Sequence, residues 1–406
     1  MSPPSSLLRF TNALLHTGGL DLLASHDLVV DVDHGVIVRI VPAETATFDC
    51  SSFDCGGRIL SPGFVDVQLN GAFGVDFSNA ASLTSAAVQE CSSRLLSTGV
   101  TSYCPTLVSL SPEEYERIIP LFREHLSSPA VLSQAKVLGL HLEGPFFNPK
   151  MKGAHSAANL KAPSNGLLSF LSTYSLPSTS LSPVILTTLA PELPGSLSLI
   201  SSLAAAGVRV SLGHTNSSYD EALAGLNAGA TLLTHLYNQM TPFHHRSPGL
   251  LPLLSSSTPP FYSVIADGVH VSHEALRVAW TLSEKTVLVT DAMAAMGLPD
   301  GEHSLGSMTV VKKGGEARLK ETASLAGSVA GMDHCVRTFR TATSCTTSQA
   351  IEAATGAPAR MLGIEGEVGA LKEGRRADLV MLEREGLEVV GTWREGRRVW
   401  RGEGEK

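Results

Sequence analysis

The chain has 406 residues, of which 43% are hydrophobic and 17% are charged, so it is globular and long enough to bury a large core. Its formal net charge is −8, and no basic cluster is present that could follow a phosphate backbone, which argues against a nucleic-acid partner. No apolar run reaches the ~18 residues that a membrane span requires, so no membrane partner is expected.

Cysteine usage and the start of the chain indicate a reducing compartment. The cysteines form no CxxC pair and no dense framework, so we expect free thiols. The first 20 residues carry Arg9 and Asn12 inside their only apolar patch and lack the core and cleavage site of a signal peptide. A cytoplasmic location is therefore expected. The cysteines stand at positions 50, 55, 91, 104, 335 and 345.

Both ends of the chain have short β-like runs separated by polar turns. They favour one small β-sandwich-like domain built from both termini, with boundaries at residues 1–60 and 365–406. Ser61-Pro62-Gly63 ends the first part. The β-like runs cover residues 27–32, 36–41, 57–60, 378–382, 389–393 and 398–400.

From residue 61 to residue 364, buried strand-like runs alternate with helical stretches, which predicts βαβ units and a parallel sheet. About eight such strands indicate an α/β fold of the (β/α)8 TIM-like barrel class. The strands are expected at 63–69, 100–104, 137–142, 183–189, 208–212, 230–234, 262–265 and 286–289. The helices are expected at 82–99, 111–127, 197–206, 218–229, 272–285 and 347–356.

Two segments interrupt this alternation. Residues 162–182 are rich in Ser, Leu and Pro, and we interpret them as an irregular excursion. Residues 303–324 have the pattern of a β-hairpin with Gly314-Gly315 at its turn.

Five polar residues follow or end apolar strand-like runs: Glu143, His214, His235, His270 and Asp291. Alone, each has an ordinary structural explanation, because a strand-end His is often a satisfied core residue and an Asp often caps the next helix. Together they mark the carboxyl ends of successive strands, where the active sites of (β/α)8 barrels are built.

These residue types suit metal-assisted hydrolysis. Two neutral imidazoles and one carboxylate with an open position fit a catalytic Zn²⁺, or a similar ion such as Fe²⁺ or Co²⁺. Asp291 can then act as the general base on water and later as the acid toward the leaving group. Cleavage of an amide or a related bond is the chemistry that this set predicts.

Several motifs resemble known families. Residues 62–71, PGFVDVQLNG, resemble the first-strand signature of the amidohydrolase superfamily, in which His-x-His normally occupies positions 68 and 70. Residues 369–380 match the return of the chain to the β domain in the same superfamily. Six further motifs resemble the N-acetylglucosamine-6-phosphate deacetylase family. They are HLEGPF (141–146), SLGHT (211–215), HLYN (235–238), DGVH (267–270), TDAM (290–293) and LAGS (325–328).

The resemblance implies a single metal ion per chain, held by Glu143, His214 and His235. Gln68 and Asn70 stand where the superfamily has its two histidines, and neutral amides are poor ligands for a transition metal. The implied reaction is hydrolysis of the N-acetyl group of N-acetyl-D-glucosamine 6-phosphate, which belongs to amino-sugar catabolism.

The resemblance also implies substrate contacts. His270 is expected to contact the sugar or the scissile carbonyl. Arg246 is expected to meet the 6-phosphate, either within one chain or across a homodimer interface, because a guanidinium binds phosphate bidentately. Gln239 stands where the family usually has Ala. Backbone contacts are expected from Ala154, Asn238, Gln239, Leu325, Ala326 and Gly327.

Two alternatives stay open at this point. A mononuclear amidohydrolase could act on another N-acyl compound or a cyclic amide. A catalytically inactive barrel could bind a sugar phosphate as a sensor, although binding alone needs no proton shuttle such as Asp291. His155, His244 and His245 lie in the same loops and are left without a role.

Overall fold

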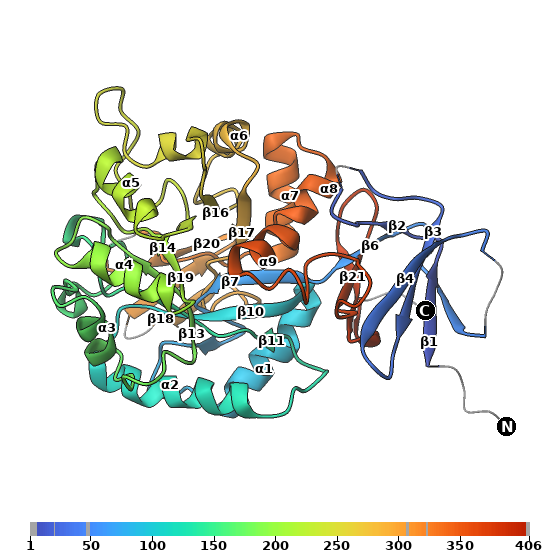
Figure 1. Cartoon of the computed structure of the whole chain (residues 1–406). Helices are drawn as coiled ribbons and strands as arrows, with labels where there is room; N and C mark the ends of the chain where they lie inside the picture. Colours follow the sequence, from blue (N-terminus) through green and yellow to red (C-terminus); the bar gives the residue numbers. More distant parts are fainter. Residues whose placement is uncertain (1–5, 20, 46–48, 306–307, 322–323, 403–406) are drawn as a thin grey trace.

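The computed structural model of the protein describes residues 6–19, 21–45, 49–305, 308–321 and 324–402. A barrel of strands and helices forms one part of the molecule, and two small sheets lie beside it, where the N-terminal strands in blue meet the C-terminal strands in red (Figure 1). None of the helices in the described ranges is both long and apolar enough to cross a membrane.

The barrel strands are parallel and buried along most of their length. They span β7 Phe64–Leu69, β10 Val100–Leu107, β11 Lys136–Val137, β12 Leu140–Glu143, β13 Val184–Leu189, β14 Arg209–Leu212, β15 Leu232–Leu233, β16 Phe261–Ile265 and β17 Thr286–Val289. Each pairs with its neighbour in this order, except that β11 is a short extra partner of β10, which also pairs with β7 and β12. Strands covered on both faces are near-continuous apolar runs, as the sequence showed. The predicted TIM-like α/β fold is confirmed.

The barrel closes between its first and last strands, β7 and β17, at their carboxyl ends. The Asp291 N–H donates to the carbonyl of Gln68 (2.9 Å), and the Asn70 N–H donates to the carbonyl of Ala292 (2.8 Å). This closure sets the backbone of Asp291 directly beside the two amide residues that replace the superfamily histidines.

Helices cover the outside of the barrel, and three of the described helices begin with capping boxes, one of which is formed by Thr346 and Gln349. Ser111 and Glu114 exchange side-chain and backbone hydrogen bonds at the start of α2, and Ser218 and Glu221 do so at the start of α5. The helices are α1 Ser85–Leu95, α2 Pro112–Ser127, α4 Ser196–Ala205, α5 Tyr219–Asn227, α6 His273–Leu282, α7 Met332–Thr343, α8 Thr347–Glu352 and α9 Gly356–Leu362. Short 3₁₀ helices are η1 Leu96–Thr98, η2 Pro149–Met151, η3 Ala157–Asn159 and η4 Leu251–Ser255.

Three details of the predicted elements are wrong. The strand expected at 137–142 is divided into β11 and β12 at Gly139, whose φ of +149° interrupts the ladder. The excursion at 162–182 contains a helix, α3 (Leu167–Thr173), which buries Phe170 against Tyr174 with the ring centroids 4.7 Å apart. The helix expected at 347–356 ends at Glu352, and α9 follows it as a separate helix.

The two ends of the chain pair as predicted. One sheet has the order β4-β3-β1-β5 and the other β2-β6-β21-β22-β23, with β6 antiparallel to β21. Phe10, Phe53 and Trp393 pack together between them at centroid distances of 5.4–5.7 Å. The domain boundaries themselves remain a prediction. The strands are β1 Leu7–Thr11, β2 Leu14–Leu15, β3 His26–Asp31, β4 Val36–Pro42, β5 Ser51–Asp54, β6 Ile59–Pro62, β21 Leu379–Leu382, β22 Val389–Arg394 and β23 Arg397–Arg401.

A small antiparallel sheet follows β17 in the chain. Its strands are β18 Gly301–Leu305, β19 Met308–Lys313 and β20 Glu316–Leu319, and a further short pair is β8 Gly71–Ala72 with β9 Val75–Asp76. The predicted hairpin turn at Gly314-Gly315 is confirmed, and β18 adds a third strand. After β20 the chain returns to the barrel, where Ser328 pairs with Ala292 in parallel. This return brings residues 325–328 to the end of β17.

A buried ion pair joins the small sheet of the C-terminal strands to the barrel. Asp378 accepts from Arg394 Nε (2.9 Å) and lies 2.8 Å from Arg376 Nη2, and Arg394 also donates to the carbonyl of Gln134 next to the barrel. The side chains of Asp378 and Arg394 are only 2% and 1% exposed. Removing one partner of such a pair leaves an uncompensated buried charge.

We therefore expect Asp378→Ala to lower the free energy of unfolding by about 3–5 kcal/mol, measured by urea denaturation of the metal-free protein. Glu302→Ala is the control, because Glu302 pairs with Lys320 (2.7 Å) where both side chains are more than half exposed. That variant should unfold at nearly the wild-type urea concentration. Equal urea midpoints for both variants would contradict a role of the buried pair.

Candidate active site

The barrel brings the predicted ligand residues to one end. Glu143 is the last residue of β12, His214 and His235 lie just beyond β14 and β15, and Asp291 lies just beyond β17. The last three residues have positive φ angles of 50°, 29° and 46°. The chain thus turns sharply where each strand ends, and the strain is concentrated at the site.

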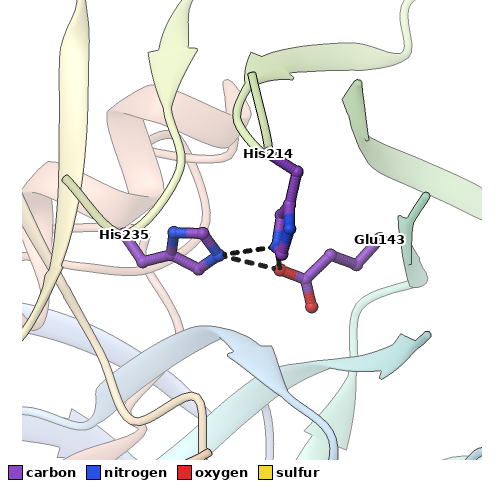
Figure 2. Close-up of side chains that lie close together, drawn as sticks. All are labelled: Glu143, His214 and His235. Carbon is purple, nitrogen blue, oxygen red and sulfur yellow. Dashed lines mark hydrogen bonds and ion pairs between the residues drawn. The ribbon is translucent and has the colours of Figure 1, made fainter. Parts of the chain in front are cut away.

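Glu143, His214 and His235 point toward one another from three different strand ends (Figure 2). Oε1 of Glu143 lies 3.1 Å from Nε2 of His235 and 3.3 Å from Nε2 of His214, and the two Nε2 atoms are 3.1 Å apart. All three residues are buried, and their ligand atoms lie within 4.8 Å of one another. This is a donor set for one divalent metal ion.

Neighbouring groups fix the ring of His214. Its Nδ1 lies 2.8 Å from the carbonyl of Met151, which can only accept, so Nδ1 carries the proton and Nε2 presents a lone pair to the other two ligands. Phe147 stacks on the same ring with a centroid distance of 4.0 Å and an interplanar angle of 8°. Burial lowers the pKa of His214, which favours the neutral form that binds metals.

The site attracts positive charge. For Glu143, burial is the largest effect and would raise the pKa, but the imidazoles of His214 and His235 beside the carboxylate outweigh it and hold the pKa well below its usual value. For His235, burial would lower the pKa, but the nearby carboxylates of Glu143 and Asp291 raise it. Two carboxylates facing buried imidazoles suit a bound cation.

Asp291 sits beside this group and is held by the two amides. Nδ2 of Asn70 donates to Asp291 Oδ1 at 2.7 Å, and Nε2 of Gln68 donates to Glu143 Oε1 at 2.8 Å and to Asp291 Oδ1 at 3.3 Å. Burial and the charge of Glu143 raise the pKa of Asp291 to about 7. A carboxyl group with such a pKa is matched to proton transfer near neutral pH.

His270 forms a pair with Asp267, a residue that the sequence-based prediction did not include in the site. Nδ1 of His270 donates to Asp267 Oδ2 (2.7 Å), and Oδ1 of Asp267 accepts from the backbone N–H groups of Val269 and His270 (2.9 Å each). The pair fixes the ring and leaves Nε2 of His270 for a ligand. The sequence Asp-Gly-Val-His could have indicated this pair, because an Asp side chain often accepts from the backbone N–H groups of the residues that follow it in a tight turn.

Most of the predicted substrate-binding residues lie on loops around the metal group. The side chain of Gln239 packs on Gly153, because a Cβ added to Gly153 would lie 3.1 Å from the side chain of Gln239. Ala154, the next residue in the chain, therefore lies close to Gln239. Gln239 also accepts from Thr215 N–H through its carbonyl (3.1 Å). Leu325, Ala326 and Gly327 run toward the backbone of Asp291, whose carbonyl accepts from Ser328 N–H at 3.0 Å.

Arg246 lies in the loop that follows β15, and its backbone N–H donates to Nδ1 of His244 (3.3 Å). It is exposed in a turn that is held by the bond from Ser247 N–H to the carbonyl of His244 (2.9 Å). Phe243 in the same loop is 60% exposed. His155, in contrast, is buried against His214, with the two rings 4.8 Å apart.

The profile of the amidohydrolase family matches residues 59–399. The chain belongs to the amidohydrolase family. It is 44% identical to the N-acetylglucosamine-6-phosphate deacetylase of Mus musculus, over 98% of this chain and 96% of that protein. The deacetylase of the same name from Homo sapiens is 43% identical over 97% of this chain and 96% of that protein. An N-acetylgalactosamine-6-phosphate deacetylase of Escherichia coli O157:H7 is 33% identical over 96% and 98%.

Solved structures agree with this membership. The N-acetylglucosamine-6-phosphate deacetylase of Pasteurella multocida superposes on this amidohydrolase with a TM-score of 0.88 at 28% identity, covering 98% of this chain and 100% of that one. A mutant deacetylase of Mycobacterium smegmatis in complex with N-acetyl-D-glucosamine-6-phosphate gives a TM-score of 0.85 at 30% identity, with the same coverage. The resemblance seen in the motifs is confirmed along nearly the whole chain.

Proposed function

We propose that this amidohydrolase hydrolyses the N-acetyl group of N-acetyl-D-glucosamine 6-phosphate, giving D-glucosamine 6-phosphate and acetate. The observation that carries this proposal is the buried group of Glu143, His214 and His235 with Asp291 beside it, in a chain that matches such deacetylases over nearly its full length. A binding protein would need neither the metal ligands nor a carboxyl group whose pKa is about 7.

The donor set supports one divalent metal ion per chain, with Zn²⁺ the best match and Fe²⁺ or Co²⁺ as alternatives. The amide N–H groups of Gln68 and Asn70 donate hydrogen bonds to Glu143 and Asp291, respectively. The two amides therefore stabilise these carboxylates and do not serve as ligands of a second ion. When bound, such a metal polarises an amide carbonyl and lowers the pKa of water to about 7.

The chain's own residues then have separate tasks. Asp291 takes the proton from the attacking water at Oδ1 or Oδ2 and returns it to the nitrogen of the leaving amine. His270, fixed by Asp267, interacts through Nε2 with the developing oxyanion or a sugar hydroxyl. The loops that carry Ala154, Asn238, Gln239 and residues 325–327 hold the sugar and exclude water.

Acetate release tests the substrate directly. We expect wild-type protein to release acetate from N-acetyl-D-glucosamine 6-phosphate much faster than from N-acetyl-D-glucosamine. The 6-phosphate of N-acetyl-D-galactosamine belongs in the same assay, because a deacetylase named for that epimer is 33% identical to this chain. If none of the three sugars is hydrolysed, the site acts on another N-acyl compound or cyclic amide.

Arg246 is proposed to bind the 6-phosphate of a substrate in the partner site of a homodimer. The exposure of Arg246 and of Phe243 in the same loop supports this role, because an exposed loop is accessible to a second chain. Charge-assisted hydrogen bonds contribute about 1.5–3 kcal/mol. We therefore expect Arg246→Ala to lower kcat/KM for the phosphorylated sugar roughly 10- to 100-fold, and to change the slow reaction of the unphosphorylated sugar little.

The comparison of two sugars and two enzymes separates a phosphate contact from general damage. An equal loss on both sugars would make Arg246 a structural residue. Light scattering of the wild type should give the mass of two chains, and a monomer with full activity would contradict the proposed partner site.

We also propose a cytoplasmic location, which the state of the cysteines supports. All six cysteines are free thiols, and four of them are buried. Such usage is typical of reducing compartments.

A further inference from the structure

One carboxylate outside the metal group joins three of the loops that surround it. Glu192 lies in the loop between β13 and α4 and is half-buried. Its Oε1 accepts from Asn148 Nδ2 (2.9 Å) and from the Asn216 N–H (2.8 Å), and its Oε2 accepts from Thr215 Oγ1 (2.6 Å). The donors belong to the loops that follow β12 and β14.

Both partner loops of Glu192 also hold His214. The Asn148 N–H donates to the carbonyl of His214 at 3.0 Å, and the side chain of Asn148 caps the short turn that ends at Met151. The carbonyl of Met151 accepts from Nδ1 of His214. On the other side, Thr215 follows His214 directly in the chain. Glu192 therefore fixes His214 from both directions without touching it.

We propose that Glu192 is a positioning residue that sets the orientation and the tautomer of the metal ligand His214. His214 has a positive φ, so its backbone needs such support from outside its own strand. Without the carboxylate, Asn148 loses the anchor for its amide, and the turn that presents the Met151 carbonyl is free to shift. Groups that orient the histidine ligands of a metal typically change its affinity 10- to 100-fold when they are removed.

The test measures metal binding, which does not depend on which substrate the enzyme hydrolyses. In Glu192→Ala we expect the Zn²⁺ dissociation constant, measured in competition with a chromophoric chelator, to rise roughly 10- to 100-fold. The visible absorption spectrum of the Co²⁺-loaded variant should change, because His214 is misoriented. Glu192→Gln keeps one acceptor oxygen for Asn148 and Asn216, so its effect should be smaller. Failure of acetate release in the wild type would count against the proposed function alone.

Two further variants separate positioning from general stability. Asn148→Ala should weaken Zn²⁺ binding about as much as Glu192→Ala, and the double variant should be little weaker than either, because both act through one contact. Glu221→Ala is the matched control, since Glu221 caps α5 through hydrogen bonds with Ser218. It should bind Zn²⁺ like the wild type.

Wild-type Zn²⁺ affinity and an unchanged Co²⁺ spectrum in Glu192→Ala would overturn the proposal, even if that variant unfolds at a lower temperature. If Glu192→Ala does not fold, the decision rests on Glu192→Gln and Asn148→Ala. Wild-type affinity in both of these variants would overturn it equally.

Discussion

Asp291→Asn is expected to keep the fold and the metal while lowering kcat for deacetylation by about 10²–10⁴, the usual contribution of a general acid–base group. The amide still has an oxygen that can accept from Asn70 Nδ2, which now bonds Asp291 Oδ1 at 2.7 Å, so the geometry should survive. It cannot take a proton from water or return one to the amine. Acetate release and metal content, measured on the same preparation, test both halves of this prediction.

Asp220→Asn is a matched control for the loss of one carboxylate, because Asp220 is exposed in the first turn of α5. The kcat of this variant for deacetylation should equal that of the wild type. Wild-type turnover in a metal-loaded Asp291→Asn protein would remove Asp291 from the mechanism. Loss of metal in the same variant would show that Asp291 supports the metal group and not only proton transfer.

The gathering of the metal ligands was predictable because it depends on topology. Parallel strands all end on the same rim of a barrel, so polar residues at the ends of successive apolar runs must meet there. Glu143, His214 and His235 do so within hydrogen-bonding distance. Their contact follows from strand direction alone and needs no knowledge of side-chain packing.

The groups that orient these ligands were not predictable in the same way. Met151, which accepts from His214, and Glu192, which anchors the neighbouring turn, lie in irregular loops. A carbonyl group is present at every residue, so the sequence carries no signal for the one that faces an imidazole. The role of Asp267 was easier to predict, because Asp267 lies in the same tight turn as His270.

The fold shows the same division. The long apolar runs gave the barrel strands, since a strand buried on both faces must be apolar throughout. Gly139 breaks a run that the pattern presents as continuous, because it takes a φ of +149° that apolar patterning cannot indicate. The helix α3 is only 7 residues long and lies in a Ser- and Pro-rich stretch. Its packing against Tyr174 stabilises it, and so short a helix has no hydrophobic periodicity from which it could be predicted.

Loss of either imidazole is expected to remove the metal almost completely. Wild-type protein should carry one equivalent of divalent metal per chain, and His214→Ala or His235→Ala should carry close to none after dialysis. With one imidazole gone, two protein ligands remain, whereas catalytic zinc sites use three. Deacetylation should be lost together with the metal. Metal content by plasma mass spectrometry and acetate release on the same samples measure both.

His273→Ala controls for the loss of a histidine, because His273 is exposed at the start of α6. It should retain one equivalent and full activity. Two equivalents in the wild type would show that Gln68 and Asn70 do not prevent a second site, contrary to their hydrogen bonds to Glu143 and Asp291. Full occupancy in either ligand variant would mean that the metal lies elsewhere. The 3.1 Å between the two Nε2 atoms argues against that outcome. Both ring nitrogens and Oε1 of Glu143 face one point, where a single cation can be shared by all three.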